Sequence, residues 1–298
     1  MPRYSCFGID LLSAVPLALP ESQKKYSVEV FVTLVEPADF SMENPFLSLS
    51  EDNGFTKIVL SAPGVAQFTI RTGKEVLVQP DLNSNSLMIP LYLTGSVLSL
   101  LLFQRGLLVL HGSVISINGH GVVFLGHSGA GKSSMAASCL QMPGNLLVAD
   151  DAAVIRFAKD TVMALPGFPR LKVDNKTALA LNMVNSELTN LEPVIDGEFA
   201  LHLDKRFSRD AVPLKAIYLL DGGDREEEME QVSSAAALLK LLPHTIPSRY
   251  GENGGPQQFR QLSTLLRSIP VFIFRRPKNL SRLHLAPQIL AEHLAALP

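Results

Sequence analysis

The feature that most constrains this chain is a short glycine-rich segment. Residues 122–134 read VVFLGHSGAGKSS and fit the pattern G-x-x-x-x-G-K-[ST]. Glycines let a backbone curl tightly so that successive N–H groups point at phosphate oxygens, and a following helix adds partial positive charge. An apolar strand before the segment and a helix after it form the context that such a loop needs. We therefore predict an α/β fold with a phosphate-binding loop at this point.

The residues of this loop are expected to hold the phosphates of a nucleotide. Lys132 would reach the β- and γ-phosphates, and the Ser133 hydroxyl would ligate Mg²⁺. The residues expected to contact the nucleotide are Gly126, His127, Ser128, Gly129, Ala130, Gly131, Lys132, Ser133 and Ser134.

Two adjacent carboxylates follow the loop after an apolar strand, LLVADD at residues 146–151. A right-handed crossover would place this strand beside residues 122–125, with both carboxyl ends at the edge where ligands bind. One carboxylate could hold the metal, and the other could take a proton from an acceptor hydroxyl. We assign Ser133 and Asp151 to the metal, while the sequence leaves open which of Asp150 and Asp151 is the base. A helix-capping role for one Asp, or water activation by an ATPase, also stays open.

Two further side chains are candidates for the same site. His111 precedes two apolar runs joined by Asn118-Gly119, a hairpin signal, and pairing of these runs would bring it near Gly126. Arg206, in DKR before the apolar run LKAIYLL, is either a solvated charge or a second cation near the phosphates.

The remaining pattern suggests two parts. Residues 1–86 read as a small β-rich module, with strands expected at 26–35 and on either side of Gly73-Lys74, and residues 87–298 as the nucleotide-binding domain. Residues 87–103 are uncharged and close to membrane-spanning length, but Pro90 and several small polar residues favour a buried helix. Polar residues and prolines also interrupt the apolar N-terminus, so we expect no signal peptide. Strands at 214–220 and 271–275 and a helix at 285–297 complete the expected elements.

Composition limits the partners. The net charge of −2 gives no basic field for nucleic acid or an anionic membrane. The two cysteines form no C-x-x-C pattern, so we expect a cytoplasmic protein without disulfides.

The string HGS…INGHGVVFLGHSGAGKSS…LLVADD resembles the catalytic core of the HPr kinase/phosphorylase family, whose fold is related to phosphoenolpyruvate carboxykinase. This resemblance implies ATP and Mg²⁺ as cofactors and a serine hydroxyl of a protein as acceptor. Lys132 and Ser133 match its nucleotide and metal positions, and Asp150 and Asp151 match its acidic pair, one of which is the base. His111 matches a histidine beside the transferred phosphate.

The chain departs from that family in its N-terminal part and at VIDGEFALHLDKRF, which lacks the family's later Gly-x-Gly signature. Its layout is similar to a divergent branch, found in lasso-peptide biosynthetic systems, through YSCFGIDLLSAVPL and DKRFSRDAVPLKAIYLL. That branch implies phosphorylation of a precursor peptide's C-terminal serine. We predict a serine kinase acting on a peptide or small protein, in a chain that could form homo-oligomers. The alternatives are an HPr-like protein kinase in metabolic regulation, or a P-loop ATPase or nucleotide-gated regulator.

Overall fold

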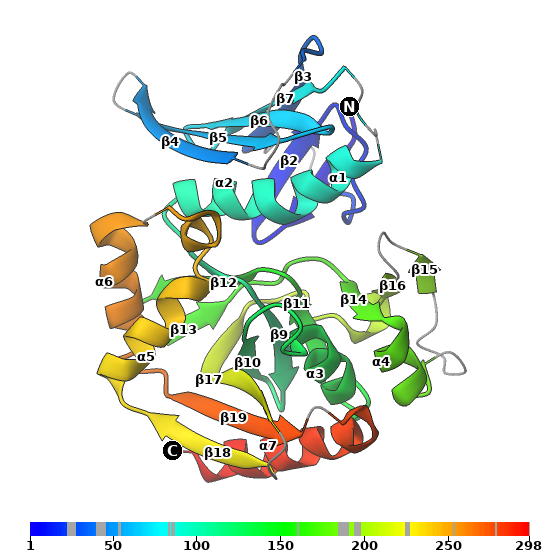
Figure 1. Cartoon of the computed structure of the whole chain (residues 1–298), viewed down its shortest axis with the longest axis vertical. Helices are drawn as coiled ribbons and strands as arrows, with labels where there is room; N and C mark the ends of the chain where they lie inside the picture. The colour runs from blue at the N-terminus through cyan, green and yellow to red at the C-terminus, as the bar shows by residue number, and fades with distance from the viewer. Residues whose placement is uncertain are drawn as a thin grey trace. The chain divides into compact units, whose positions relative to one another are not determined.

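The computed structural model of the chain describes residues 1–298 except 23–27, 40–45, 53–54, 83, 85–86, 160, 184–190, 194–197, 224–226, 253, 278 and 298. The chain forms two compact units, which Figure 1 shows in colours that follow the sequence. The first unit contains Met1–Val109 and Thr245–Gly255, and the second contains Leu110–His244 and Pro256–Pro298. Each unit is described by itself below.

The first unit contains a sheet in the order β1-β2-β3-β7-β6-β5-β4. Its strands are β1 (Arg3–Cys6), β2 (Ile9–Ser13), β3 (Val30–Leu34), β4 (Phe46–Asp52), β5 (Phe55–Ala62), β6 (Ala66–Arg71) and β7 (Glu75–Pro80). The predicted hairpin at Gly73-Lys74 is confirmed, because β6 and β7 pair antiparallel and Gly73 has a φ of 63°. The strand expected at 26–35 is shorter, and the first two residues of that range lie outside the described residues.

The uncharged segment before the phosphate loop is a buried helix, as predicted. It consists of α1 (Met88–Tyr92), a π-helical turn η1 (Leu93–Val97) and α2 (Leu98–Gln104). Tyr92 stacks on Phe68 of the sheet at 5.9 Å between ring centroids, and the Gln104 side chain accepts a 2.6 Å hydrogen bond from Gly73 N. These contacts group the helix with the first unit, whereas we had expected it to begin the second domain at residue 87. Among the described residues, no helix has both the length and the apolar character that crossing a bilayer requires.

The second unit is built on a mixed sheet in which β11, β9, β10, β17, β13 and β12 follow one another, while β17 also pairs with β19 and β19 with β18. Strand β8 (Leu108–Leu110) leads into it. The other strands are β9 (Gly112–Ile117), β10 (His120–Leu125), β11 (Leu146–Ala149), β12 (Ala153–Ala158), β13 (Thr161–Ala164), β17 (Val212–Gly223), β18 (Glu228–Val232) and β19 (Val271–Pro277). The predicted strands at 214–220 and 271–275 are therefore present as β17 and β19.

Strand order in this sheet differs from our prediction at one place. Strand β11 pairs with β9, not with β10, because the hairpin partner β9 takes the position next to β10. Both pairings are antiparallel, so β10 and β11 still run in the same direction and end at the same edge. The hairpin turn is confirmed, since Asn118 and Gly119 have φ values of 51° and 81°.

Helices and a smaller sheet complete the second unit. The helices are α3 (Lys132–Cys139), α4 (Asn175–Ala180), α5 (Ser234–Leu241), α6 (Gly255–Leu265) and α7 (Ala286–Ala296), the last being the predicted C-terminal helix. Short 3₁₀ turns are η4 (Asp204–Arg206), η5 (Leu242–His244) and η7 (Leu280–Leu285), and η6 (Pro247–Tyr250) belongs to the first unit. Strands β14 (Arg170–Asp174), β15 (Leu191–Pro193) and β16 (Glu198–His202) form the small sheet, and residues 194–197 of the divergent VIDGEF segment lie outside the described residues.

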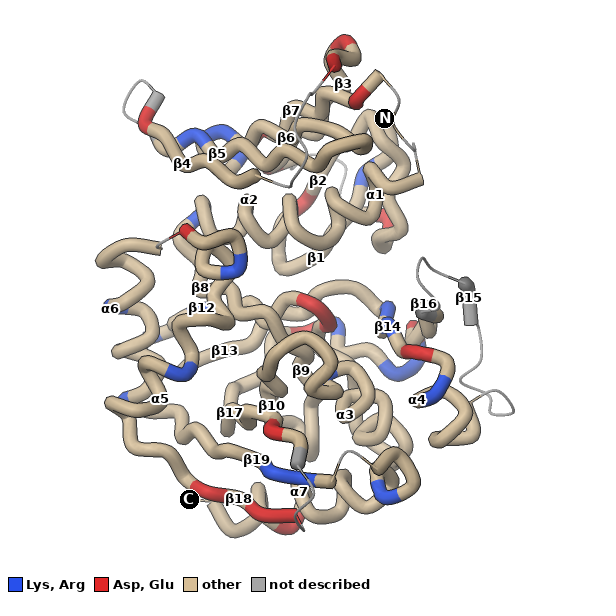
Figure 2. Tube along the Cα trace, viewed as in Figure 1, with Lys and Arg blue, Asp and Glu red and all other residues tan. Residues whose placement is uncertain are grey.

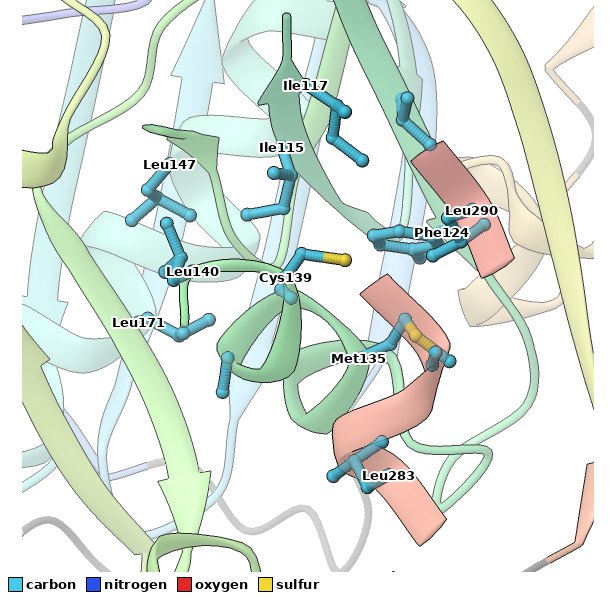
Figure 3. Close-up of a cluster of buried hydrophobic side chains, with 14 of the residues drawn as sticks. Ile115, Ile117, Phe124, Met135, Cys139, Leu140, Leu147, Leu171, Leu283 and Leu290 are labelled. Carbon is cyan, nitrogen blue, oxygen red and sulfur yellow. The ribbon is translucent and has the colours of Figure 1, made fainter. Parts of the chain in front are cut away.

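The core of the second unit fixes the position of α3. Figure 3 shows Ile115 and Phe124 of the large sheet facing Met135 and Cys139 of α3, with Leu290 of α7 beside them. These side chains are fully buried. Burying a large apolar side chain stabilises a fold by roughly 1.5–3 kcal/mol. The start of α3, and with it the glycine-rich loop, is therefore held rigidly at the end of β10.

Candidate active site

The glycine-rich loop joins β10 to α3 in a tight curl. Gly129 and Gly131 have φ values of 76° and 87°, which residues with a Cβ rarely adopt. A Cβ added to Gly126 would come within 2.7 Å of the Cβ of Ala130. The Lys132 ammonium donates to the carbonyl oxygens of Gly126 at 3.0 Å and His127 at 3.2 Å. The Lys132 charge therefore lies against the first residues of the loop.

The other loop residues differ in exposure. His127, Ser128 and Gly129 are exposed, so their backbone is accessible to a ligand. Ser134 is partly buried, and its hydroxyl lies 2.8 Å from that of Thr177 on α4. This bond connects the first turn of α3 to α4.

Asp150 is the most constrained carboxylate of the site. It is buried, and its Oδ1 accepts hydrogen bonds from the hydroxyls of Ser113 at 2.6 Å and Ser133 at 3.2 Å. Its Oδ2 accepts from Lys172 N at 3.1 Å. Our sequence-based assignment paired Ser133 with Asp151 at the metal, but the structure places Asp150 next to Ser133. Because the backbone turns sharply after β11, the first Asp points inward and the second does not.

Asp151 lies on the open side of the same turn. Its φ of 64° is left-handed, a conformation that Asp tolerates better than most residues. Its carboxylate forms a 2.7 Å ion pair with Lys172, and its side chain is 40% exposed. Asp151 is therefore the carboxylate that a bound molecule can reach, since Asp150 is buried.

His111 joins the site through the same residue. The hairpin register pairs Gly112 with Leu125, which places His111 level with Gly126, whereas the sequence predicted only that the two residues lie near each other. Its Nδ1 is 3.0 Å from the Asp151 carbonyl oxygen, which can only accept, so Nδ1 carries a hydrogen. The Nε2 atom is then an acceptor in the neutral ring and a donor in the charged ring.

Burial raises the pKa of Asp150 to about 6, and the neighbouring charge of Asp151 contributes in the same direction. Hydrogen bonds from Ser113 and Lys172 oppose this rise. Without a metal, Asp150 therefore keeps its proton to a higher pH than an ordinary Asp does, and a bound cation would compete with that proton.

Replacement of Asp150 by Asn should change how stability depends on pH. The folded-state pKa exceeds the ordinary Asp value, so this group's contribution to stability is present below about pH 4 and is lost as pH rises to about 6. The neutral Asn side chain has no such loss. As pH rises from about 4 to about 7.5, the free energy of unfolding of Asp150→Asn, relative to that of the wild type, should therefore increase by on the order of 2 kcal/mol. Urea melts of both metal-free proteins measure this, and a pH-independent difference would contradict the raised pKa of Asp150.

The donor set fits Mg²⁺ bound together with phosphates. The residues that would hold it are Ser133 and Asp150, whose oxygen atoms lie 3.2 Å apart. Among the described residues, no cluster of three His, Cys, Asp or Glu side chains could form an all-protein metal site. Mg²⁺ commonly uses one or two protein oxygens and completes its shell with water and substrate phosphates, so two ligands suffice.

Arg206, which the sequence left as either a solvated charge or a second cation near the phosphates, does not join this site. Its guanidinium donates to the carbonyl oxygens of Leu140 at 2.6 Å, Met142 at 2.8 Å and Asn145 at 3.2 Å. These carbonyls lie at and beyond the C-terminal end of α3, whereas the phosphate loop is at its N-terminal end. Arg206 therefore caps the far end of the helix, where cations are favoured.

A pocket of about 280 Å³ adjoins the loop within the second unit. It is lined by Gly126, His127, Leu219, Leu220, Asp221, Lys240, Pro243, His244 and Ile273. His244 connects it to the site, because its carbonyl accepts a 2.7 Å hydrogen bond from His111 N. The pocket lies at the carboxyl ends of β10 and β17, the usual ligand edge of parallel strands.

Sequence reasoning missed four residues of this arrangement: Ser113, Lys172, Thr177 and His244. Ser113 directly follows His111-Gly112, and the hairpin register could have placed it. The other three come from segments distant in sequence, and their residue types are common on any surface. No local pattern distinguishes them.

Comparisons with known proteins concern the middle of the chain. A family model, the HPr serine kinase C-terminal domain, matches residues 107–169. The part of the chain around the glycine-rich loop is therefore similar to an HPr serine kinase domain. The HPr kinase/phosphorylase of Prosthecochloris aestuarii is 42% identical over 57 residues, which are 19% of this chain and 16% of that protein. The solved Hpr(Ser) kinase/phosphatase of Coxiella burnetii aligns with a TM-score of 0.35 and 10% identity, covering 63% of this chain and 97% of that one.

The matched segment includes the glycine-rich loop and several of the side chains described above. Residues 107–169 contain His111, the glycine-rich loop, Asp150 and Asp151. Lys172 and the segments from β14 onward lie outside the match. The matched region spans only 16% of the curated relative, so this match does not establish that the chain has the relative's activity.

Proposed function

We propose that this chain is a Mg·ATP-dependent kinase that transfers the γ-phosphoryl group to a serine hydroxyl of a peptide or protein. The observation that carries the proposal is the Ser133–Asp150 contact of 3.2 Å at the start of α3. In this proposal the two side chains bind a metal beside the phosphate loop. The next residue, Asp151, provides a second carboxylate that is accessible. The match to the HPr serine kinase domain supports the same reaction class.

Each residue has a distinct role in this reaction. Loop N–H groups and Lys132 hold the phosphates, and Ser133 with Asp150 holds Mg²⁺, which neutralises phosphate charge when bound. Asp151 accepts the hydroxyl proton as the serine oxygen bonds to the γ-phosphorus and the bond to the ADP oxygen breaks. His111, fixed by the Asp151 carbonyl, stabilises charge on the transferring group through Nε2.

The acceptor that we propose is the C-terminal serine of a lasso-peptide precursor. This rests on the resemblance of YSCFGIDLLSAVPL and DKRFSRDAVPLKAIYLL to kinases of such systems. The second candidate is an HPr-like protein, which the 42% identity over 57 residues favours. The pocket beside His127 and His244 would accommodate part of either substrate.

Incubation with γ-labelled ATP and three acceptors distinguishes these possibilities. The acceptors are a peptide ending in serine, the same peptide ending in alanine, and an HPr-like protein. We expect label on the terminal serine of the first peptide, located by mass spectrometry, and none on the alanine peptide. Label on the HPr-like protein alone would select the second candidate. Phosphate release at an equal rate with and without acceptor would instead indicate an ATPase and overturn the kinase proposal.

A further inference from the structure

A buried arginine lies next to the phosphate loop. Arg276, near the end of β19, is 9% exposed. Within the described part of the chain, its Nε atom has no hydrogen-bond partner, and Nη1 donates a long bond of 3.4 Å to the Pro277 carbonyl. A buried guanidinium that is poorly hydrogen-bonded destabilises the fold. A bound anion that accepts hydrogen bonds from the guanidinium would offset this cost.

Strand alternation directs Arg276 toward α3. Phe272 and Phe274, two and four residues earlier on β19, belong to the core cluster shared with α3 and α7. Arg275 points to the opposite face and pairs with the acidic strand β18, whose red colour beside the blue end of β19 is visible in Figure 2. Arg276 is therefore on the face of the sheet that carries the loop and α3.

The guanidinium packs directly against the loop. A Cβ added to Gly131 would collide with Arg276 Nη2, so this glycine leaves the space that the arginine fills. Gly131 is the N-cap of α3 and precedes Lys132. A helix N-terminus carries partial positive charge, and a second positive group beside it is unfavourable unless an anion lies between or near them.

Nearby acidic groups only partly offset the Arg276 charge. Burial lowers the pKa of Arg276, and the charge of Glu227 acts in the opposite direction. Glu227, however, already forms a 2.7 Å ion pair with Arg282. Among the described residues, no carboxylate forms an ion pair with Arg276.

We propose that Arg276 is a phosphate-binding residue that donates from its guanidinium to the phosphates of a nucleoside di- or triphosphate in the loop. This inference rests on the proposed function only in assuming that a nucleotide occupies the loop. Arg276 thus has the role that one interpretation of the sequence gave to Arg206, a second cation near the phosphates. Lys132 approaches the loop from its first residues and Arg276 from its last glycine, so two charges flank the phosphate site.

The test is nucleotide affinity, measured by calorimetry with ATP, ADP and AMP in the presence of Mg²⁺. Arg276→Gln should weaken ATP and ADP binding about 10- to 100-fold, the range expected for a charged hydrogen bond to phosphate. Arg276→Lys keeps the charge but loses the forked donors. Its affinity for ATP and ADP should therefore lie between those of Arg276→Gln and the wild type. The matched control is Arg275→Gln, on the opposite face of the same strand, which should bind ATP within about twofold of wild type.

The outcomes separate this inference from the kinase proposal. ATP binding by folded Arg276→Gln or Arg276→Lys at wild-type strength would overturn the role of Arg276, even if serine phosphorylation is observed. If Arg276→Gln does not fold, Arg276→Lys still decides, because undiminished ADP affinity in that variant contradicts donation by the fork. Wild-type protein that binds nucleotide in an Arg276-dependent manner but labels no serine would overturn the kinase alone. A wild type that binds no nucleotide would overturn both.

Discussion

Replacement of Lys132 by Ala should lower the rate of phosphoryl transfer at least about a thousandfold, the lower end of what a cation contributes when it stabilises the charge of a transferring phosphoryl group. Lys132 lies against the loop carbonyls of Gly126 and His127, so its charge is already directed at the place where phosphate oxygens would lie. Charge on these oxygens changes during transfer, and no neutral side chain can replace the ammonium. ATP affinity should fall as well, because the same charge holds the ground state.

Single-turnover assays with labelled ATP measure this loss, with calorimetry for ATP affinity. Lys176→Ala is a suitable control, because Lys176 is an exposed lysine on α4 in the same unit. It should leave both quantities within about twofold of wild type. A Lys132→Ala enzyme that keeps even a tenth of the wild-type rate would show that the loop does not hold the transferred phosphate as we propose.

Much of the site could be predicted because its parts are close in sequence. Residues 111–151 contain a histidine, a hairpin, the loop, a helix and the Asp pair, and each has a local signal. Asn118-Gly119 fixed the hairpin register, and the register placed His111 level with Gly126. Strand alternation and the glycine spacing need no knowledge of the rest of the fold.

What could not be predicted depends on contacts between distant segments. Arg206 and Arg276 are both basic residues near a buried strand, and only the folded chain shows that the first caps the end of α3 and the second packs on Gly131. Likewise, both carboxylates follow the same strand, and the left-handed backbone of Asp151 decides which one meets Ser133. The helix at Met88–Gln104 shows a third case, because an apolar pattern predicts burial but does not identify the sheet that covers it.

Replacement of Asp151 by Asn should separate binding from chemistry. Asp151 is the more exposed member of the pair, and it is Asp150 that bonds to the Ser133 hydroxyl, so ATP affinity should stay within about threefold of wild type. The amide of Asn is similar in shape but cannot accept a proton at neutral pH. A serine hydroxyl is barely acidic, so loss of the base should lower kcat by about 100- to 10,000-fold.

The ion pair with Lys172 provides the decisive control. Lys172→Met removes the 2.7 Å ion pair but leaves the Asp151 carboxylate in place. If Asp151 accepts the proton, Asp151→Asn should lower kcat much more than Lys172→Met does. Equal losses in the two variants would mean that the carboxylate acts only by positioning Lys172, and a wild-type rate in Asp151→Asn would contradict any role in transfer.

Because Asp150 holds the metal in our assignment, Asp150→Asn should instead raise the Mg²⁺ concentration needed for half-maximal rate. This effect distinguishes the two carboxylates by kinetics.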